Sequence, residues 1–193
     1  LYGDAATAPH RRSLARVRRG QAEALPRKLE RLPPDFGPRT WRPALARSGA
    51  MVVGARKVLV AWNVTLQSDD LVLAKSIAET VRTSGGGLPA VRALGWRIPE
   101  YGRVQVSTNL LDWRQTSPWA LTEAVRHEAA RRGVAVAGAE LIGLVPEAAL
   151  LADAPHETVG RPRRLERLVA AHGLDHLGDF ELEERVLERR LPV

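Results

Sequence analysis

Residues 58–81 read VLVAWNVTLQSDDLVLAKSIAETV, a strand signal followed directly by a helix signal. The run Val58–Val64 is rich in β-branched and aromatic residues, which is typical of a β-strand. Apolar residues then recur at helical spacing over Leu71–Val81, and Ser68 is the expected N-cap. This stretch therefore predicts a β-α unit.

The sequence after this unit continues the alternation. Further strands are expected at Val91–Ile98, Val104–Leu111 and Val134–Leu144, and a second helix between Ser117 and Gly133. The order β-α-β-β-α-β predicts an α/β (α+β) fold, a ferredoxin-like sandwich in which two helices cover one face of an antiparallel sheet. The other face must then be buried against a ligand or a second sheet. Helical pieces are expected after the sandwich, at Pro146–Ala152, Arg163–His172 and Glu181–Arg189.

The residues before the sandwich predict a different kind of structure. A helix is expected over Leu14–Leu29, with interruptions near Gly20 and Pro26. The prolines of the following segment, 33–43, fix an extended loop, since each lacks a backbone donor and restrains its neighbour. The predicted division is into residues 1–57, an N-terminal extension, and residues 58–193, the sandwich with its C-terminal helices.

Composition limits the function classes. A hydrophobic fraction of 45% supports a core, and no apolar run is long enough to span a bilayer, so a cytoplasmic protein is expected. The absence of cysteine excludes disulfides and thiolate metal sites, and no metal is expected. Residues 1–57 hold 13 Lys or Arg and 4 Asp or Glu, a charge of +9, whereas the rest hold 16 and 18, a charge of −2. The basic part either attracts an anionic partner or is a solvated surface.

One predicted strand has two chemically distinct faces. Over Val104–Leu111, apolar residues alternate with residues that can hydrogen-bond, and such a polar face suits either a polar, heterocyclic ligand or plain solvent. Asn63 ends the first strand, and the neighbouring cations Arg56 and Lys57 alternate on it, so that one of them could pair with a substrate carboxylate. The substrate-cleft candidates are Arg56, Lys57, Asn63, Gln105, Ser107 and Asn109.

Familiar catalytic motifs are not found. His127-Glu128 lacks a second histidine four residues on, and Gly173 breaks the helix between His172 and His176. The triplet Gly85–Gly87 is not followed by Lys-Ser or Lys-Thr, so it is a turn and not a phosphate loop.

Several blocks in fixed order resemble one family. They are Leu1-Tyr2-Gly3, Pro34–Pro38, Gly49-Ala50 leading to Gly54–Lys57, Ala61–Val64, Gln105–Leu110 and Gly143–Pro146. Together they resemble the glutamate formimidoyltransferase (formiminotransferase) family. The resemblance implies that residues 1–57 are the end of an N-terminal subdomain and residues 58–193 the C-terminal subdomain. It also implies transfer of a formimino group from N-formimidoyl-L-glutamate to N5 of tetrahydrofolate, as cosubstrate, in histidine degradation.

The resemblance also implies site residues. The family's folate-binding loop corresponds to Gly37, Pro38, Arg39, Thr40, Trp41, Arg42, Pro43, Ser48 and Gly49, with a few additional residues near 44–47. Trp41 and Trp62 are the expected fluorescence reporters of folate. The family's catalytic histidine is expected upstream of Leu1, and no histidine of this chain corresponds to it. The five are His10, His127, His156, His172 and His176. No catalytic residue is therefore assigned in this chain, which is expected to be inactive by itself.

The expected partners are folate, N-formimidoyl-L-glutamate and the missing N-terminal subdomain, and a homodimer through the free sheet face is left open. No nucleic acid or membrane partner is expected. One alternative is a non-catalytic folate-binding or assembly subunit. A further alternative is an RNA-binding ferredoxin-like domain, which is disfavoured because the polar strand face has no aromatic residue for base stacking. The formimino donor, glutamate or glycine, is also left open.

Overall fold

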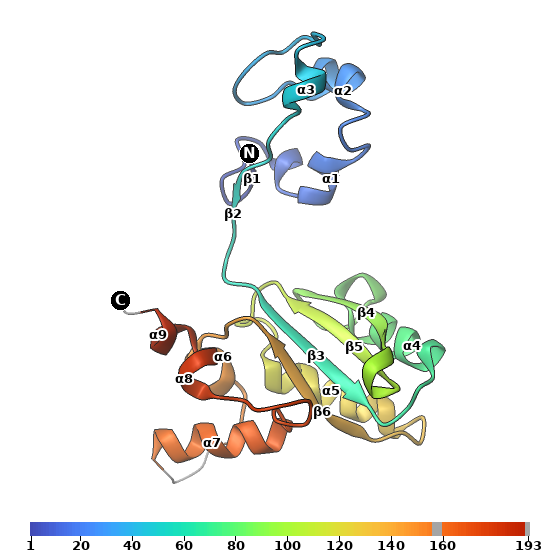
Figure 1. Ribbon diagram of the computed structural model, residues 1–193, viewed down its shortest axis with the longest axis vertical. Coiled ribbons are helices and arrows are strands. Elements are labelled where there is room, and N and C mark those ends of the chain that lie inside the picture. The colour runs from blue at the N-terminus through green and yellow to red at the C-terminus, as the bar shows by residue number, and fades with distance from the viewer. Residues whose placement is uncertain (156–159, 192–193) are drawn as a thin grey trace. The chain divides into compact units, whose positions relative to one another are not determined.

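The computed structural model describes residues 1–155 and 160–191, and the chain divides into two compact units, Leu1–Lys57 and Val58–Val193 (Figure 1). Within the described ranges, no helix combines the length and the apolar character needed to cross a membrane. The first unit contains β1 (Tyr2–Gly3), η1 (Pro9–Arg11), α1 (Leu14–Arg18), α2 (Leu25–Arg31), α3 (Leu45–Ser48) and β2 (Gly54–Ala55).

The second unit contains a larger set of elements. It begins with β3 (Val60–Leu66), α4 (Leu71–Val81), η2 (Thr83–Gly85), β4 (Val91–Ile98), η3 (Pro99–Tyr101) and β5 (Arg103–Leu110). It continues with α5 (Pro118–Ala130), β6 (Val136–Ile142), α6 (Glu147–Leu151), α7 (Arg161–His172), α8 (Leu182–Arg185) and α9 (Leu187–Arg190).

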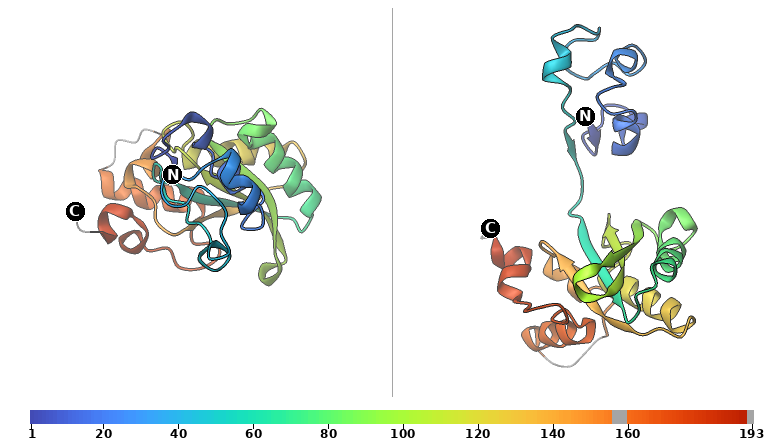
Figure 2. Two further views of the ribbon diagram at one scale, coloured as in Figure 1. Left: turned by 90° about the horizontal axis from the view of Figure 1, so that it is seen from above. Right: turned by 45° about the vertical axis from the view of Figure 1, so that its right-hand side comes forward.

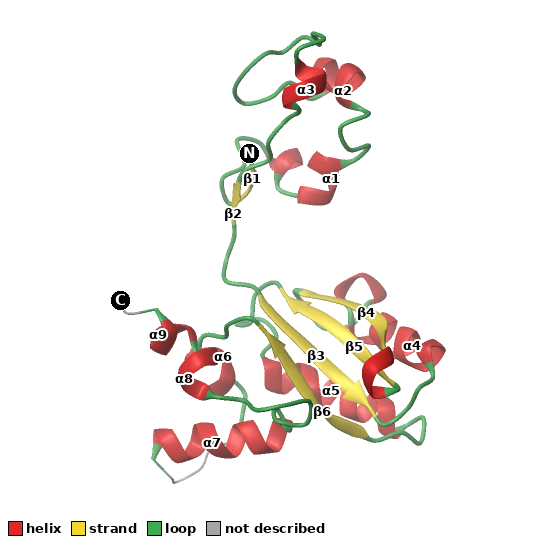
Figure 3. Ribbon diagram, viewed as in Figure 1, coloured by secondary structure: helices red, strands yellow, loops and turns green. Residues whose placement is uncertain are grey.

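The second unit is a sandwich of helices on a sheet. Its four strands run in the order β4-β5-β3-β6, and every neighbouring pair is antiparallel. Helices α4 and α5 pack on one face of this sheet and leave the other face uncovered by them (Figures 2 and 3). The predicted ferredoxin-like α+β fold is confirmed, and the strand boundaries differ from the expected ones by one or two residues.

Helix α4 begins at a different cap from the one predicted. The Asp70 carboxylate accepts hydrogen bonds from the amides of Val72, at 2.8 Å, and Leu73, at 3.2 Å. Ser68 was the expected N-cap, and that prediction is wrong by two residues. Its hydroxyl instead accepts from the Asp70 amide at 3.1 Å. A carboxylate at the N-cap also interacts favourably with the positive end of the helix, which favours Asp70.

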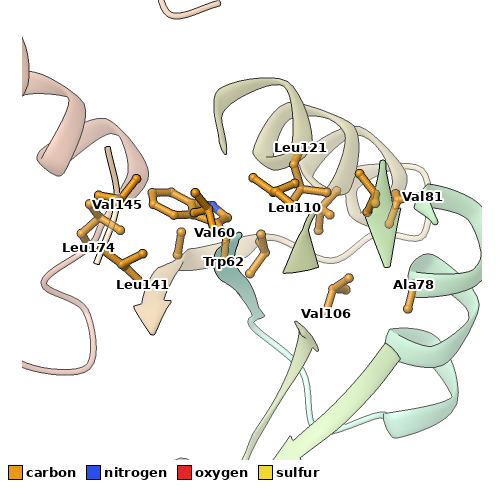
Figure 4. Close-up of a cluster of buried hydrophobic side chains, with 14 of the residues drawn as sticks. Val60, Trp62, Ala78, Val81, Val106, Leu110, Leu121, Leu141, Val145 and Leu174 are labelled. Carbon is orange, nitrogen blue, oxygen red and sulfur yellow. The ribbon is translucent and has the colours of Figure 1, made fainter. Parts of the chain in front are cut away.

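The core lies between the sheet and its helices (Figure 4). On β3, alternate residues Val60, Trp62, Val64 and Leu66 are all 0% exposed. Burying a side chain of this kind stabilises the fold by roughly 1.5–3 kcal/mol. The indole nitrogen of Trp62 also donates to the Thr122 hydroxyl at 3.1 Å, so its one polar atom is satisfied inside the core.

The C-terminal segment differs in one respect from the expected helices. In place of one helix over Glu181–Arg189, the structure has α8 and α9, separated by Val186 in an extended conformation. Val186 forms a parallel bridge with Val145, and the Leu187 amide donates to the Val145 carbonyl at 2.9 Å. This pairing competes with helical hydrogen bonding and interrupts the helix.

In the first unit, the predicted helix over Leu14–Leu29 is replaced by two short helices, α1 and α2. Pro26 lies in the first turn of α2, where its missing amide costs nothing, so it opens this helix and does not interrupt it. Helix α3 was not predicted. Arg56 and Lys57 were expected on a strand, but they lie between β2 and β3, outside both.

Candidate functional site

A set of polar side chains meets on the face of the sheet opposite α4 and α5. The strand register places Thr65 of β3 directly beside Gln105 of β5, and Asn63 of β3 beside Glu140 of β6. Because side chains alternate along a strand, these four share one face. We call this set, with His176, the polar cluster.

Hydrogen bonds join the members of the polar cluster. The Gln105 amide nitrogen donates to the Thr65 hydroxyl at 3.0 Å and to Glu140 Oε2 at 2.9 Å. The Asn63 amide nitrogen donates to the same Glu140 oxygen at 3.2 Å, and its carbonyl oxygen accepts from the Thr108 amide at 3.2 Å. Gln105 is only 2% exposed, so its orientation is held by these bonds and not by solvent.

His176 reaches the polar cluster from the segment after α7. Its Nε2 atom lies 2.8 Å from the Thr65 hydroxyl, and its Nδ1 atom lies 2.8 Å from the Gly173 carbonyl. A Cβ atom on Gly138 of β6 would lie 2.4 Å from that carbonyl and 2.7 Å from the imidazole. Only glycine therefore allows the segment 173–176 to pass this close to the sheet.

Apolar side chains lie around the polar cluster. Trp96 of β4 is paired in register with Gln105 and is 58% exposed, and Leu94 and Ile142 are also exposed on the same face. An RNA-binding domain was disfavoured because the β5 face lacks an aromatic residue. The sheet face as a whole does present one, Trp96 of β4, so the lack of an aromatic residue no longer disfavours RNA.

The predicted cleft residues fall into three groups. Asn63 and Gln105 belong to the polar cluster. Ser107 is half-buried and Asn109 is exposed, and both lie on the same sheet face by strand alternation. Arg56 and Lys57 are exposed and belong to the first unit, so their roles stay predictions.

The predicted folate loop lies in the first unit. The segment 37–43 is exposed throughout, as is Ser48, and Trp41 is 37% exposed. Within this unit a largely apolar hollow of about 620 Å³ includes Pro38, Leu45 and Gly49 in its lining. Part of the loop therefore borders a concave surface.

A second hollow in the first unit has a basic lining. Its volume is about 740 Å³, and it has no acidic residue in its wall. The lining consists of His10, Arg16, Arg19, Ala24, Arg27, Lys28, Arg31 and Leu32. Burial lowers the pKa of Lys28, whose ammonium donates to the Arg19 carbonyl at 2.8 Å. Five of the 13 Lys and Arg residues of the first unit thus lie around one concave surface.

The histidines occupy different environments. His10 and His127 are exposed, and His156 lies outside the described residues. His172 is 1% exposed, with its ring edge-on to Trp62 at 4.9 Å and to Trp119 at 5.3 Å. Burial, with a smaller contribution from the charge of Arg126, lowers the pKa of His172 to about 4.

Candidate metal ligands do not gather in the described part of the chain: no group of three or more His, Asp or Glu side chains could hold an ion there.

Sequence reasoning missed four residues of this face. Thr65 could have been found because it is two residues after Asn63 on the same strand. Glu140 could have been found because it faces Asn63 in an antiparallel sheet. Trp96 could have been found by extending the same alternation to the neighbouring strand. His176 carries no such signal, since it comes from a turn 111 residues after Thr65.

Trp62 was expected to report on folate, and it does not lie on the open face of the sheet. Its side chain is 0% exposed and packs on the helix-covered side, against Thr122 and His172. Trp96 is the tryptophan that lies beside the polar cluster.

Comparison with known proteins identifies the family. Residues 61–192 match the family model described as formiminotransferase domain, and residues 1–56 match its N-terminal subdomain. Formimidoyltransferase-cyclodeaminase of Mus musculus is 39% identical over 207 residues, which cover 100% of this chain and 38% of the mouse protein. Glutamate formimidoyltransferases of Streptococcus pyogenes serotype M1 and Thermoplasma acidophilum are 42% and 40% identical, over 78% of this chain and 50% of each relative. The chain thus spans half or less of these relatives' length. It belongs to the formiminotransferase domain family.

Proposed function

We propose that this chain is the folate-binding portion of a glutamate formimidoyltransferase. The observation that carries the proposal is the hydrogen-bonded polar cluster on the open face of the sheet, in a chain that belongs to this family. Sheet faces that combine a few oriented polar groups with apolar surroundings suit a heterocyclic ligand. The ligands are tetrahydrofolate and N-formimidoyl-L-glutamate. The formimino group passes from N-formimidoyl-L-glutamate to N5 of tetrahydrofolate.

The proposed reaction needs both positioning and proton transfer. N5 attacks the amidine carbon and forms a new C–N bond, and the bond from that carbon to the glutamate nitrogen then breaks. A base must take the N5 proton while the glutamate amine leaves protonated. Holding the two reactants in register is a large part of such catalysis.

The described histidines do not provide this base on the sheet face. His172 is buried among aromatic rings, and His176 has both ring nitrogens engaged. We therefore assign binding and orientation to this chain and place the base in sequence outside it. On this proposal residues 1–193 alone bind folate without turnover, in the cytoplasm.

The basic hollow of the first unit has a place in this proposal. Folates carry glutamate carboxylates, and the donor is a dicarboxylate, so both ligands are anionic. A concave surface with four arginines and one lysine attracts such groups and raises their local concentration. We propose that this hollow attracts the carboxylates, and the predicted loop from Gly37 to Gly49 contacts the folate.

The test is a transfer assay with the natural full-length protein. With N-formimidoyl-L-glutamate and tetrahydrofolate we expect 5-formiminotetrahydrofolate to form, and N-formimidoylglycine in the same assay identifies the donor. Absence of transfer with either donor overturns the proposed activity. If the same protein binds 5-formyltetrahydrofolate without transfer, the chain belongs to a non-catalytic folate-binding subunit.

Binding by residues 1–193 is measured separately, by calorimetry with 5-formyltetrahydrofolate. A parallel titration with single-stranded RNA at two salt concentrations tests the nucleic-acid alternative. Affinity for RNA that falls steeply with salt, with none for folate, would favour that alternative.

A further inference from the structure

The orientation of Gln105 follows from its partners. Glu140 is a carboxylate and only accepts hydrogen bonds, so the Gln105 atom 2.9 Å from it must be the amide nitrogen. The second hydrogen of that nitrogen goes to Thr65 at 3.0 Å. With both donors used, the Gln105 carbonyl oxygen is the atom left for another partner.

The orientation of His176 is set in the same way. The Gly173 carbonyl only accepts, so Nδ1 of His176 carries the proton. In the tautomer that carries its proton on Nδ1 alone, the Nε2 atom accepts from the Thr65 hydroxyl. Since the hydroxyl hydrogen is used here, the Thr65 oxygen can only accept from Gln105. The tail segment thereby holds Gln105 in one orientation.

Two acceptor atoms remain for a ligand. In the described part of the chain neither Glu140 Oε1 nor Gln105 Oε1 takes a hydrogen bond, whereas Glu140 Oε2 already accepts two. The polar cluster thus offers acceptors and a negative charge. A ligand carboxylate would be repelled here, and a group with N–H donors would be attracted.

Trp96 adds a constraint on ligand shape. Its position directly across from Gln105 puts the two side chains next to each other, with Cβ atoms about 5 Å apart. An aromatic ring that is 58% exposed favours a flat ligand beside it.

We propose that Glu140 and Gln105 accept hydrogen bonds from a planar N–C–N group with N–H donors on both nitrogens, bound beside Trp96. Thr65 and His176 are positioning residues that act through Gln105. The choice of ligands rests on the proposed function, since both of its substrates contain such a group. In tetrahydrofolate it is the 2-amino-pyrimidinone edge of the pterin, and in N-formimidoyl-L-glutamate it is the amidine.

The test compares two pteridines that differ in this edge. Pterin carries the 2-amino group, and lumazine has a carbonyl in its place. Calorimetry with residues 1–193 should show pterin binding at least about 10-fold more tightly than lumazine, because a site built for a donor rejects the analogue that lacks it. In Glu140→Gln the preference should fall to about 2-fold or less, because the charged acceptor is lost.

The matched control is Glu123→Gln. Glu123 is exposed on α5, on the other side of the sheet. The variant therefore makes the same chemical change away from the polar cluster. This variant should keep the full preference for pterin. An unchanged preference in Glu140→Gln, with circular dichroism as in the parent chain, overturns the proposal, as does the absence of binding of both pterin and the amidine to the parent chain.

A pair of variants tests the positioning role. Thr65→Ser keeps the hydroxyl and should keep the preference, whereas Thr65→Val keeps the shape and should lose it. A merely structural role would change the unfolding temperature without changing the ratio of the two affinities. Equal ratios in the two variants would remove Thr65 and His176 from the proposal.

Competition identifies the occupant. If N-formimidoyl-L-glutamate displaces pterin from the parent chain, and more weakly from Glu140→Gln, the acceptor pair binds the amidine; if it does not displace pterin, the pair binds the pterin. If the full-length protein transfers the formimino group but the preference for pterin over lumazine does not depend on Glu140, this inference is refuted and the proposed function stands. If that preference depends on Glu140 but the full-length protein shows no transfer, the inference stands and the proposed function is refuted.

Discussion

The two units of this chain differ in how they bury apolar surface. In Leu1–Lys57, Leu29 is the one buried hydrophobic residue, whereas the described part of Val58–Val193 buries a continuous cluster between its sheet and helices. The first unit relies on polar contacts, such as the Asp35 carboxylate with Arg11 at 3.0 Å. In such a half-buried ion pair, the cost of removing both charges from water offsets most of their attraction, so its net contribution is smaller than that of a core side chain.

This difference indicates which unit contributes most to the stability of the fold. A unit of 57 residues is marginal even when it buries the usual share of its surface, and this one buries much less. We infer that the second unit supplies most of the free energy of unfolding. The first unit supplies charge and exposed loops, features that attract ligands without stabilising a fold.

The largest expected effect comes from replacing a tryptophan in each unit. Trp62→Ala removes a fully buried ring and leaves a cavity, and it should lower the free energy of unfolding by about 3–5 kcal/mol. Trp41→Ala removes a ring that is already 37% exposed, and it should change the free energy of unfolding by roughly 0.5 kcal/mol or less. Urea denaturation followed by circular dichroism measures both. Equal losses in the two variants would contradict the comparison.

The second prediction concerns pH and His172. Its pKa is lowered from 6.5 to about 4 in the folded state, so the unfolded chain binds the proton more tightly. Stability from this group is complete above about pH 6.5 and is lost as the pH falls toward 4. Between pH 7 and pH 4 the shift lowers the free energy of unfolding by about 3 kcal/mol. Urea denaturation at the two pH values measures this loss.

His172→Leu provides the control, because an apolar side chain of similar volume neither binds a proton nor leaves a buried nitrogen without a partner. Both ring nitrogens of His172 are without hydrogen bonds in the described structure. The variant should show a clearly smaller loss below pH 6, and His127→Gln, on the exposed side of α5, should behave like the parent chain. A loss of the same size in His172→Leu would assign the pH dependence to other groups.

The smallest effect tests how firmly the tail belongs to the second unit. Gly138→Ala places a methyl group 2.4 Å from the Gly173 carbonyl and should cost about 1–3 kcal/mol as the segment shifts. Gly160→Ala, at a glycine with nothing within 4 Å, should cost about 1 kcal/mol or less, and only because Gly160 is the N-cap of α7. Thermal unfolding measures both. A neutral Gly138→Ala would mean that segment 173–176 moves freely from the sheet.

Much of the second unit could be predicted from the sequence, because its signals are local. Strand β5 alternates strictly, and its apolar positions Val104, Val106 and Leu110 are buried as that pattern requires. Ser117 is the N-cap of helix α5, and its hydroxyl accepts from the Ala120 amide at 3.1 Å, as the Ser-Pro signal predicts. The first unit was harder to predict, since short helices such as α3 have little periodicity and no buried face.

The polar cluster could be predicted only in part. Asn63 and Gln105 stood out because strand alternation placed them on one face, and Glu140 could have been added as the residue opposite Asn63. His176 comes from a turn after α7 and carries no such signal.

The order of strands and helices, the family and the uneven charge could all be inferred from the sequence, because these depend on residue types at local spacing. Which polar residues meet depends on the folded chain. The tertiary structure brought His176 to Thr65 by passing the chain over Gly138, and it turned Gln105 so that its amide nitrogen donates to both Thr65 and Glu140. The physical reason is that a hydrogen bond depends on the distance between two atoms in space. For residues 111 positions apart, no local sequence pattern predicts that distance.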